Sequence, residues 1–130
     1  MKYKVFCDGA SRSNPGEAAI GVSIETDGKE IHTISKTIGI ASNNEAEYLA
    51  LDSALEYCLK NDFMNLEIFL DSKLVLEQVN GNFKVKSNNL KPLRDKILEH
   101  IEMLEFVSIN HIYRENNKRA DELANLALDS

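Results

Sequence analysis

The first forty residues contain three segments in which apolar and polar side chains alternate. The alternation runs over residues 2–8, 18–26 and 31–40. A two-residue period is the pattern of a β-strand with one buried face. An Asn-Pro-Gly turn at residues 14–16 and an Asp-Gly turn at residues 27–28 separate the segments. The first third of the chain therefore predicts a three-stranded antiparallel meander.

The hydrophobic period then changes to that of helices. Residues 43–60 carry apolar side chains at helical spacing, and Ser42 or Asn43 can cap this helix. The pattern next predicts a strand, two helices, a strand and a helix, over residues 66–70, 72–79, 90–104, 107–111 and 120–127. The order βββαβααβα predicts an α/β fold with a mixed five-stranded sheet, in which two parallel strands join the antiparallel meander and helices flank the sheet.

Length and composition restrict the class of protein. A chain of 130 residues with 43% hydrophobic residues suits one compact domain, which we expect to span residues 1–130. The formal net charge of −6 is unlike that of a generic polyanion binder, so composition alone argues against nucleic acid as a partner. No stretch approaches the roughly 20 apolar residues of a membrane span, and no targeting segment is recognised. We expect a cytoplasmic monomer without membrane contact or an obligate protein partner.

Four acidic residues stand where the predicted elements can bring their side chains together. Two follow apolar strands and two lie early in helices: Asp8, Asp71, Glu47 and Asp121. If the strands before Asp8 and Asp71 are parallel neighbours, both carboxylates emerge at the same carboxyl edge of the sheet. The alternatives are a plain turn at Asp8-Gly9 and a strand-ending or helix-capping role for Asp71.

Converging carboxylates require compensating cations. Two like charges about 4 Å apart repel by roughly 4 kcal/mol at an effective dielectric constant of about 20. Ligand sets made only of oxygen suit Mg²⁺ or Mn²⁺ rather than Zn²⁺. Three or four carboxylates can hold two such ions about 3.5–4 Å apart, which serves in-line displacement at a phosphodiester without a His, Ser or Cys nucleophile.

Four motifs around these acids resemble those of the type 1 ribonuclease H family. They are DGASRSNPG at residues 8–16, SNNEAEY at 42–48, LDS at 70–72 and RENNKRADELAN at 114–125. The motifs occur in the family's order and span nearly the whole chain. The last motif and the short chain are most similar to the archaeal-type branch, which also occurs in bacteria and lacks the basic protrusion of better-known bacterial members.

The resemblance implies an RNase H-like fold and an endonuclease that hydrolyses the RNA strand of an RNA–DNA hybrid, leaving 5′-phosphate and 3′-hydroxyl ends. It also implies two Mg²⁺ ions, with Mn²⁺ as an alternative, held by the four acids. Asp8 would bridge both ions, and Asp71 and Asp121 would hold the ion that activates water. Glu47 would bind the ion on the leaving-group side and contact the ribose 2′-hydroxyl, the group that distinguishes RNA from DNA.

Four polar residues match family positions that contact the hybrid. Asn14, Asn43 and Asn44 would face its minor groove, where amides can donate to and accept from base edges and 2′-hydroxyls. Ser42 would contact a phosphate of the DNA strand. Local roles are the alternative, because Asn14 suits a turn before proline, and Ser42 or Asn43 suits a helix cap.

The region of the family's basic protrusion is short in this chain. Residues 81–96 nevertheless hold five basic side chains against one acidic side chain. Such a strip on an acidic chain could seat the nucleic acid backbone, with Lys84 and Lys86 as contacts. The alternative is a solvated helix face whose long side chains cover apolar surface.

The loop at residues 112–120 lacks the histidine that many family members place there to assist product release. Arg114 or Glu115 would then take part of that role. Asn117, four residues before Asp121, stands where some relatives have an auxiliary acidic ligand, and helix capping is its alternative. His111 falls in the pattern of the last strand, which favours a structural or edge-strand role.

The remaining histidines and the cysteines give no chemical signal. His32 and His100 have no partner at ligand spacing along the chain, so surface positions are expected. Cys7 and Cys58 form no CxxC pair, and two reduced buried thiols are expected.

Two other functions remain open at this stage. The acidic charge and the missing loop histidine are compatible with an inactive relative that binds nucleic acid or protein without cutting it. The four acids are also compatible with a nuclease of the same superfamily that acts on double-stranded RNA or on a DNA junction, although the asparagines and Glu47 favour recognition of a 2′-hydroxyl. A substrate panel with added divalent metal separates these functions from a hybrid-specific nuclease.

Overall fold

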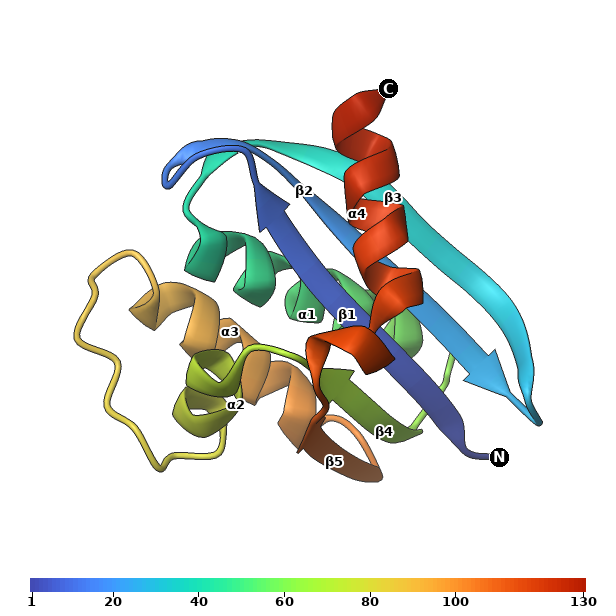
Figure 1. Ribbon diagram of the computed structural model, residues 1–130. Coiled ribbons are helices and arrows are strands. Elements are labelled where there is room, and N and C mark those ends of the chain that lie inside the picture. Colours follow the sequence, from blue (N-terminus) through green and yellow to red (C-terminus); the bar gives the residue numbers. More distant parts are fainter.

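The chain forms five strands and four α-helices in the computed structural model, which describes residues 1–130 (Figure 1). In chain order the elements are β1 (Tyr3–Ser11), β2 (Gly16–Thr26), β3 (Lys29–Ala41), α1 (Asn43–Lys60), β4 (Asn65–Leu70), α2 (Lys73–Val79), α3 (Lys91–Glu102), β5 (Phe106–His111), the short 3₁₀ helix η1 (Arg114–Asn116) and α4 (Lys118–Asp129). The predicted order of strands and α-helices is confirmed. The predicted boundaries differ from the observed ones by a few residues at most.

The five strands form one mixed sheet in the order β3-β2-β1-β4-β5. β1 pairs antiparallel with β2, and β2 pairs antiparallel with β3. β4 and β5 run parallel to β1 and to each other. The predicted α/β class and mixed sheet are confirmed, and the central position of β1 places its side chains beside those of β4.

β1 extends beyond its predicted end at Asp8. Gly9 pairs with Ile20 of β2, and Ser11 pairs with Ala18, so the strand continues past the carboxylate. The plain turn considered at Asp8-Gly9 is therefore wrong. The backbone after Asp8 pairs with β2, a segment that begins several residues later in the chain. The Asp-Gly dipeptide alone suggests a turn and gives no information about this pairing.

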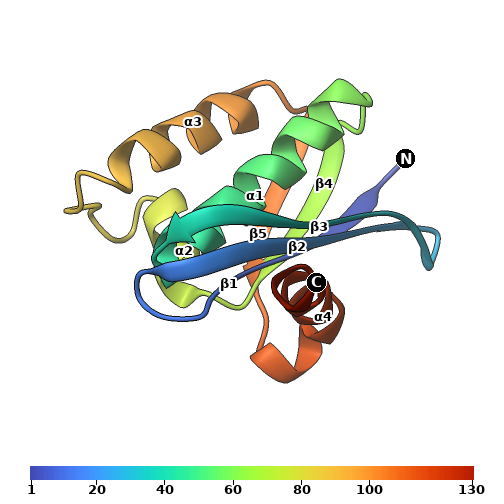
Figure 2. The same ribbon diagram turned by 90° about the horizontal axis from the view of Figure 1, so that it is seen from above.

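Helices cover both faces of the sheet. Figure 2 shows α1 above the sheet and α4 below it, with α3 on the outer side of α1. The core between α1 and the sheet contains fully buried aliphatic side chains from both, including Val5, Ile20, Leu51 and Leu55. Both cysteines are free and buried, as expected. None of the helices combines the length and the apolar composition needed to cross a membrane.

Candidate active site

Asp8 and Asp71 lie side by side because β1 and β4 are parallel neighbours. Cys7 pairs with Leu70, so the next residue on each chain segment is one of the two acids. Asp8 is buried within β1, and Asp71 follows the last residue of β4. The predicted convergence of these two carboxylates is confirmed. It follows from the parallel register, which aligns side chains across neighbouring strands.

Glu47 reaches the same place from the first turns of α1. Ser42 begins this helix with a capping box, in which its hydroxyl accepts from the Glu45 N–H and the Glu45 side chain accepts from the Ser42 N–H. The Gly9 N–H donates to Glu47 Oε1 at 3.1 Å. A Cβ on Gly9 would lie 2.2 Å from the Ala46 carbonyl carbon, so only glycine allows α1 to approach β1 this closely.

Asp121 lies on α4, which packs on the face of the sheet opposite to α1 (Figure 2). Asp8 pairs with Gly21 of β2, and residues paired across neighbouring strands share a face. A Cβ on Gly21 would lie 2.1 Å from the Ala120 carbonyl oxygen. The absent side chain therefore lets α4 lie directly against β2. Asp121, the residue after Ala120, is thereby placed on the same face of the sheet as Asp8.

All four acids line a single cleft. The cleft has a volume of about 480 Å³ and also includes Arg12, Asn43 and Arg114 in its wall. Ligand oxygens of Asp8, Glu47 and Asp71 lie within 4.8 Å of one another. Asp121 lines the cleft outside that tighter group, and its Oδ1 accepts a hydrogen bond from Asn125 Nδ2 at 3.2 Å.

Burial and mutual repulsion change the acidity of the cluster. Burial raises the pKa of the Asp8 carboxyl from 3.8 to about 7, and the charges of Asp71 and Asp121 add to the rise. Burial is also the largest cause of the raised pKa of Glu47, and the charge of Asp8 raises it further. The hydrogen bond from the Gly9 N–H acts in the opposite direction and lowers this pKa. Both shifts have the direction expected for carboxylates that leave water and approach other carboxylates.

The raised pKa of Asp8 predicts an unusual pH dependence of stability without divalent ions. Between about pH 4 and pH 7 the folded protein holds a proton that the unfolded chain has released, so the free energy of unfolding falls as pH rises through this window. Chemical denaturation in a chelator at pH 5 and pH 8 measures the effect. Asp8→Asn should reduce the difference between the two pH values. An unchanged difference would contradict the assignment.

The same residues fit a divalent metal site. The cluster offers only oxygen ligands, which Mg²⁺ and Mn²⁺ prefer. Glu47 Oε2 is buried and has no hydrogen-bond partner, although unpartnered buried polar atoms are rare in proteins. A cation beside this oxygen would satisfy it and would offset the repulsion among the three carboxylates. The observed cluster thus supports the predicted metal-binding character of Asp8, Glu47 and Asp71.

Asn117 holds the cluster together in a way that the sequence did not indicate. Its side chain is 1% exposed, and Nδ2 donates to the Cys7 carbonyl at 2.9 Å and to Asp71 Oδ2 at 3.0 Å. Asn117 stands at the N-cap position of α4, as its capping alternative predicts, but its side chain makes no capping hydrogen bond to the helix. One amide therefore connects the start of α4 to β1 and orients the Asp71 carboxylate.

Asn117→Ala should consequently weaken both the fold and the site. The substitution leaves the buried Cys7 carbonyl without this donor and should lower the free energy of unfolding by about 1–3 kcal/mol. Asp71 would lose its orienting contact, so the affinity of the acidic cluster for divalent cations should fall as well. Denaturant unfolding and titration with Mn²⁺ measure the two effects. Asn116→Ala, at an exposed neighbouring position, is the control and should change neither.

The residues expected to contact substrate lie near one end of α1. Asn14 Oδ1 accepts a hydrogen bond from the Asn43 N–H at 3.0 Å, which joins the β1–β2 loop to the first turn of α1. Asn43 lines the acidic cleft, whereas Ser42 and Asn44 border a neighbouring depression. Ser42 supplies the helix cap, so the cap alternative for Asn43 is wrong. The contacts of these side chains with a hybrid stay predictions.

The other predicted residues divide into those at the cleft and those away from it. Arg114 lines the cleft, and Glu115 is an exposed neighbour in η1. Lys84 and Lys86 are exposed in the segment between α2 and α3 and make no ion pair. His111 ends the edge strand β5 and is exposed, which agrees with an edge-strand position.

One expectation about the histidines is wrong. His32 stacks on Tyr57, but His100 on α3 faces two carboxylates of α1, Asp52 and Glu56. The partners lie more than forty residues away in sequence, so no spacing along the chain connects them. The only local signal was the four-residue interval between Asp52 and Glu56, which places both on one helix face.

Known proteins resemble the chain over nearly its full length. A family described as reverse transcriptase-like matches residues 6–127. Ribonuclease HI of Halobacterium salinarum is 42% identical over 129 residues, which cover 98% of this chain and 65% of that protein. The curated relative is thus longer than this chain, and the match leaves about a third of it uncovered.

Solved structures agree with these sequence matches. The crystal structure of RNase H1 from Halobacterium salinarum superposes with a TM-score of 0.96 at 40% identity, covering 99% of this chain and 98% of that chain. LC11-RNase H1 in complex with an RNA/DNA hybrid superposes with a TM-score of 0.91 at 40% identity, covering 98% and 96%.

Proposed function

Because the chain belongs to the type 1 ribonuclease H family, we propose that it hydrolyses the RNA strand of RNA–DNA hybrids with the aid of two divalent metal ions. The observation that carries the proposal is the single cleft lined by Asp8, Glu47, Asp71 and Asp121. Similarity to a relative crystallised with an RNA/DNA hybrid supports the substrate. The expected products have 5′-phosphate and 3′-hydroxyl ends.

Each acid has a distinct position from which to act. Asp8, buried on the central strand β1, lies close to both Asp71, which follows β4, and Glu47 on α1, which suits a carboxylate shared by two ions. Asp71 and Asp121 approach from the side of η1 and α4, where they would hold the ion beside the attacking water. When bound, two Mg²⁺ or Mn²⁺ ions would activate the attacking water and stabilise the leaving oxygen.

Glu47 is the acid best placed to read the sugar. Its Oε1 is held by the Gly9 N–H, which leaves Oε2 without a protein partner. An unpartnered carboxylate oxygen can accept a hydrogen bond from a ribose 2′-hydroxyl as well as bind a cation. DNA lacks this hydroxyl, so the contact would select the RNA strand.

Substrate recognition would depend on the α1 end of the cleft. The hydrogen bond between Asn14 and Asn43 fixes two segments that together would face the minor groove, with Asn44 beside them. Ser42 would contact a DNA phosphate next to the helix cap. The exposed Lys84 and Lys86, in the segment between α2 and α3, would meet the nucleic acid backbone.

The loop around η1 would assist turnover without a histidine. Arg114 lines the cleft and carries a permanent positive charge that can attract the released phosphate. Glu115 would play a smaller part from its exposed position. Asn117 acts through Asp71 and is best described as a positioning residue.

A substrate panel tests the function directly. Labelled RNA–DNA hybrid, double-stranded RNA and double-stranded DNA are incubated with the protein and Mg²⁺ or Mn²⁺. We expect cleavage of the RNA strand of the hybrid and none of double-stranded DNA, and the double-stranded RNA arm tests the broader substrate range. Equal cleavage of double-stranded DNA would contradict the role of the 2′-hydroxyl. Binding of hybrid without products under either metal would instead identify an inactive relative.

A further inference from the structure

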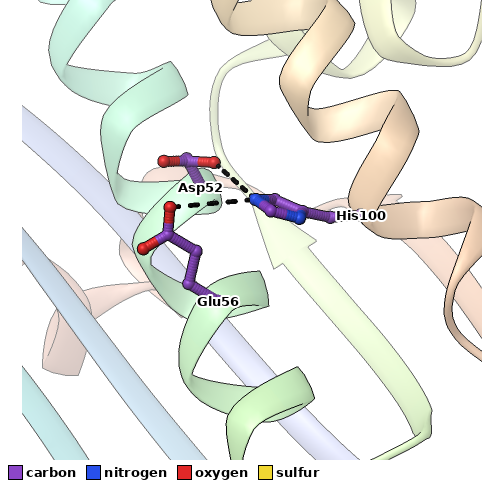
Figure 3. Close-up of side chains that lie close together, drawn as sticks. All are labelled: Asp52, Glu56 and His100. Carbon is purple, nitrogen blue, oxygen red and sulfur yellow. Dashed lines mark ion pairs between the residues drawn. The ribbon is translucent and has the colours of Figure 1, made fainter.

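A second group of metal-ligating side chains lies between α1 and α3. Asp52 and Glu56 are one helical turn apart on α1, and His100 faces them from α3 (Figure 3). One ligand atom from each side chain lies within 4.8 Å of the other two. None of the three residues lines the acidic cleft. The group is therefore separate from the proposed catalytic centre.

The distances bring the imidazole against both carboxylates. His100 Nε2 lies 3.1 Å from Asp52 Oδ1 and 3.8 Å from Glu56 Oε1. In Figure 3 the ring nitrogen points toward the two carboxylates. Two atoms bound to one tetrahedral zinc at about 2.0–2.1 Å are about 3.3 Å apart, so the 3.1 Å between Nε2 and Asp52 Oδ1 suits neighbouring ligands of one ion, and Glu56 Oε1 lies about half an ångström further away than this distance.

The Asp52 side chain supplies an independent indication of a ligand. It is 8% exposed, and its Oδ1 has no hydrogen-bond partner although it is directed at His100. Both ring nitrogens of His100 are also buried without a hydrogen bond. Buried polar atoms without partners are unfavourable, and a cation between Oδ1 and Nε2 would satisfy both atoms. The ring proton can then reside on Nδ1, which leaves the Nε2 lone pair for the ion.

We propose that Asp52, Glu56 and His100 bind a late first-row divalent cation, for which Zn²⁺ is the probe. A set of one imidazole and two carboxylates suits zinc, whereas Mg²⁺ prefers oxygen ligands and retains its waters. The Glu56 side chain is 49% exposed and gives the ion access from solvent. Water would complete the coordination on that side.

Lys96 occupies part of the group when no ion is bound. Its Nζ lies 3.1 Å from Asp52 Oδ2 and 2.8 Å from Glu56 Oε1. The ammonium partly neutralises the two carboxylates, which explains how the group persists without a metal. Because the Lys96 side chain is 49% exposed and flexible, it can release Glu56 to the ion. Lys96 thus competes with the cation rather than contributing to its site.

The bound ion would fasten α3 to α1. The two helices pack through Ile97 and neighbouring apolar side chains, and an ion would add a direct bond between them. The segment with Lys84 and Lys86 leads into α3, so the position of this basic segment would depend on the same attachment.

Zinc binding by matched variants tests the proposal. The experiment uses the full chain carrying Asp8→Asn and Asp71→Asn, which disables the acidic cleft and makes the result independent of the proposed hydrolysis. Isothermal titration with Zn²⁺ should show one site, and excess Mg²⁺ should not displace the ion. His100→Gln in this background should lower the affinity about tenfold or more. His32→Gln, which changes a histidine stacked on Tyr57, should bind zinc normally.

Two further variants protect the test against loss of folding. Glu56→Gln alters an exposed side chain and should also weaken zinc binding, while circular dichroism shows an unchanged fold. Lys96→Gln should bind zinc more tightly, because the competing ammonium is gone. Equal zinc affinity with and without His100 would overturn the proposal and leave an ordinary ion-pair cluster. Weaker binding by Lys96→Gln would overturn it as well.

Discussion

Asp8→Asn is expected to lower the rate of hybrid hydrolysis by roughly a thousandfold or more, because several kcal/mol of metal-dependent stabilisation would be lost. Asp8 is 6% exposed and lies within a cluster whose ligand oxygens are all within 4.8 Å of one another. Its replacement removes the charge around which the others are arranged. The measurement is the initial rate on labelled hybrid at saturating Mg²⁺.

The fold should survive this substitution. The raised pKa of Asp8 shows that its charge is unfavourable in the metal-free protein, so a neutral amide should leave the free energy of unfolding unchanged or higher at pH 8. Asp95→Asn on α3, an exposed carboxylate that pairs with Arg94, is the matched control and should retain activity. Wild-type rates in Asp8→Asn would refute the proposed site, and loss of folding would give Asp8 a structural role.

Gly21→Ala is expected to destabilise the protein by roughly 3 kcal/mol and to reduce activity strongly. The added methyl group would lie 2.1 Å from the Ala120 carbonyl oxygen and 2.6 Å from the Ala124 nitrogen. Backbone atoms of a helix cannot yield individually, so α4 must move away from β2. The same movement would carry Asp121 out of the cleft. Thermal or denaturant unfolding and the hybrid assay measure the two consequences.

Gly39→Ala separates the collision from the general effect of losing a glycine. Gly39 has a φ of +83°, and no atom lies within 4 Å of its added Cβ. Its substitution therefore introduces only backbone strain, which amounts to about 1–2 kcal/mol, and should leave hydrolysis intact. If both variants lost activity to the same extent, the close contact of α4 with β2 would not be what positions Asp121.

Periodicity predicts the fold because large apolar side chains gather on one side of most elements. In β2 both faces are buried, and large aliphatic side chains alternate with small ones that lie toward α4. Turns at Asn-Pro-Gly and Asp-Gly separate the strands. The alternation predicts an end of β1 at Asp8, whereas pairing with β2 extends the strand to Ser11. Strand ends depend on partners elsewhere in the chain.

The sequence likewise predicts the four acids of the cleft but not the contacts that hold them in place. The predicted elements place Asp8 and Asp71 after apolar strands and Glu47 and Asp121 early in helices, and the four motifs contain the same acids. Asn117 was assigned to metal binding or helix capping, yet its amide contacts the Cys7 carbonyl and Asp71. A hydrogen bond between residues 110 positions apart leaves no pattern in a single chain.

Local order along the chain specifies which segments become strands and helices, and which of them carry acids, because burial of one face imposes a period that neighbouring residues must share. Distances between side chains follow from register and packing instead. The pairing of Cys7 with Leu70 aligns two carboxylates, and the missing side chain of Gly21 admits α4. The approach of His100 to Asp52 likewise exists only once α3 packs on α1. Each of these contacts joins segments that are distant in sequence, and only folding brings such segments together.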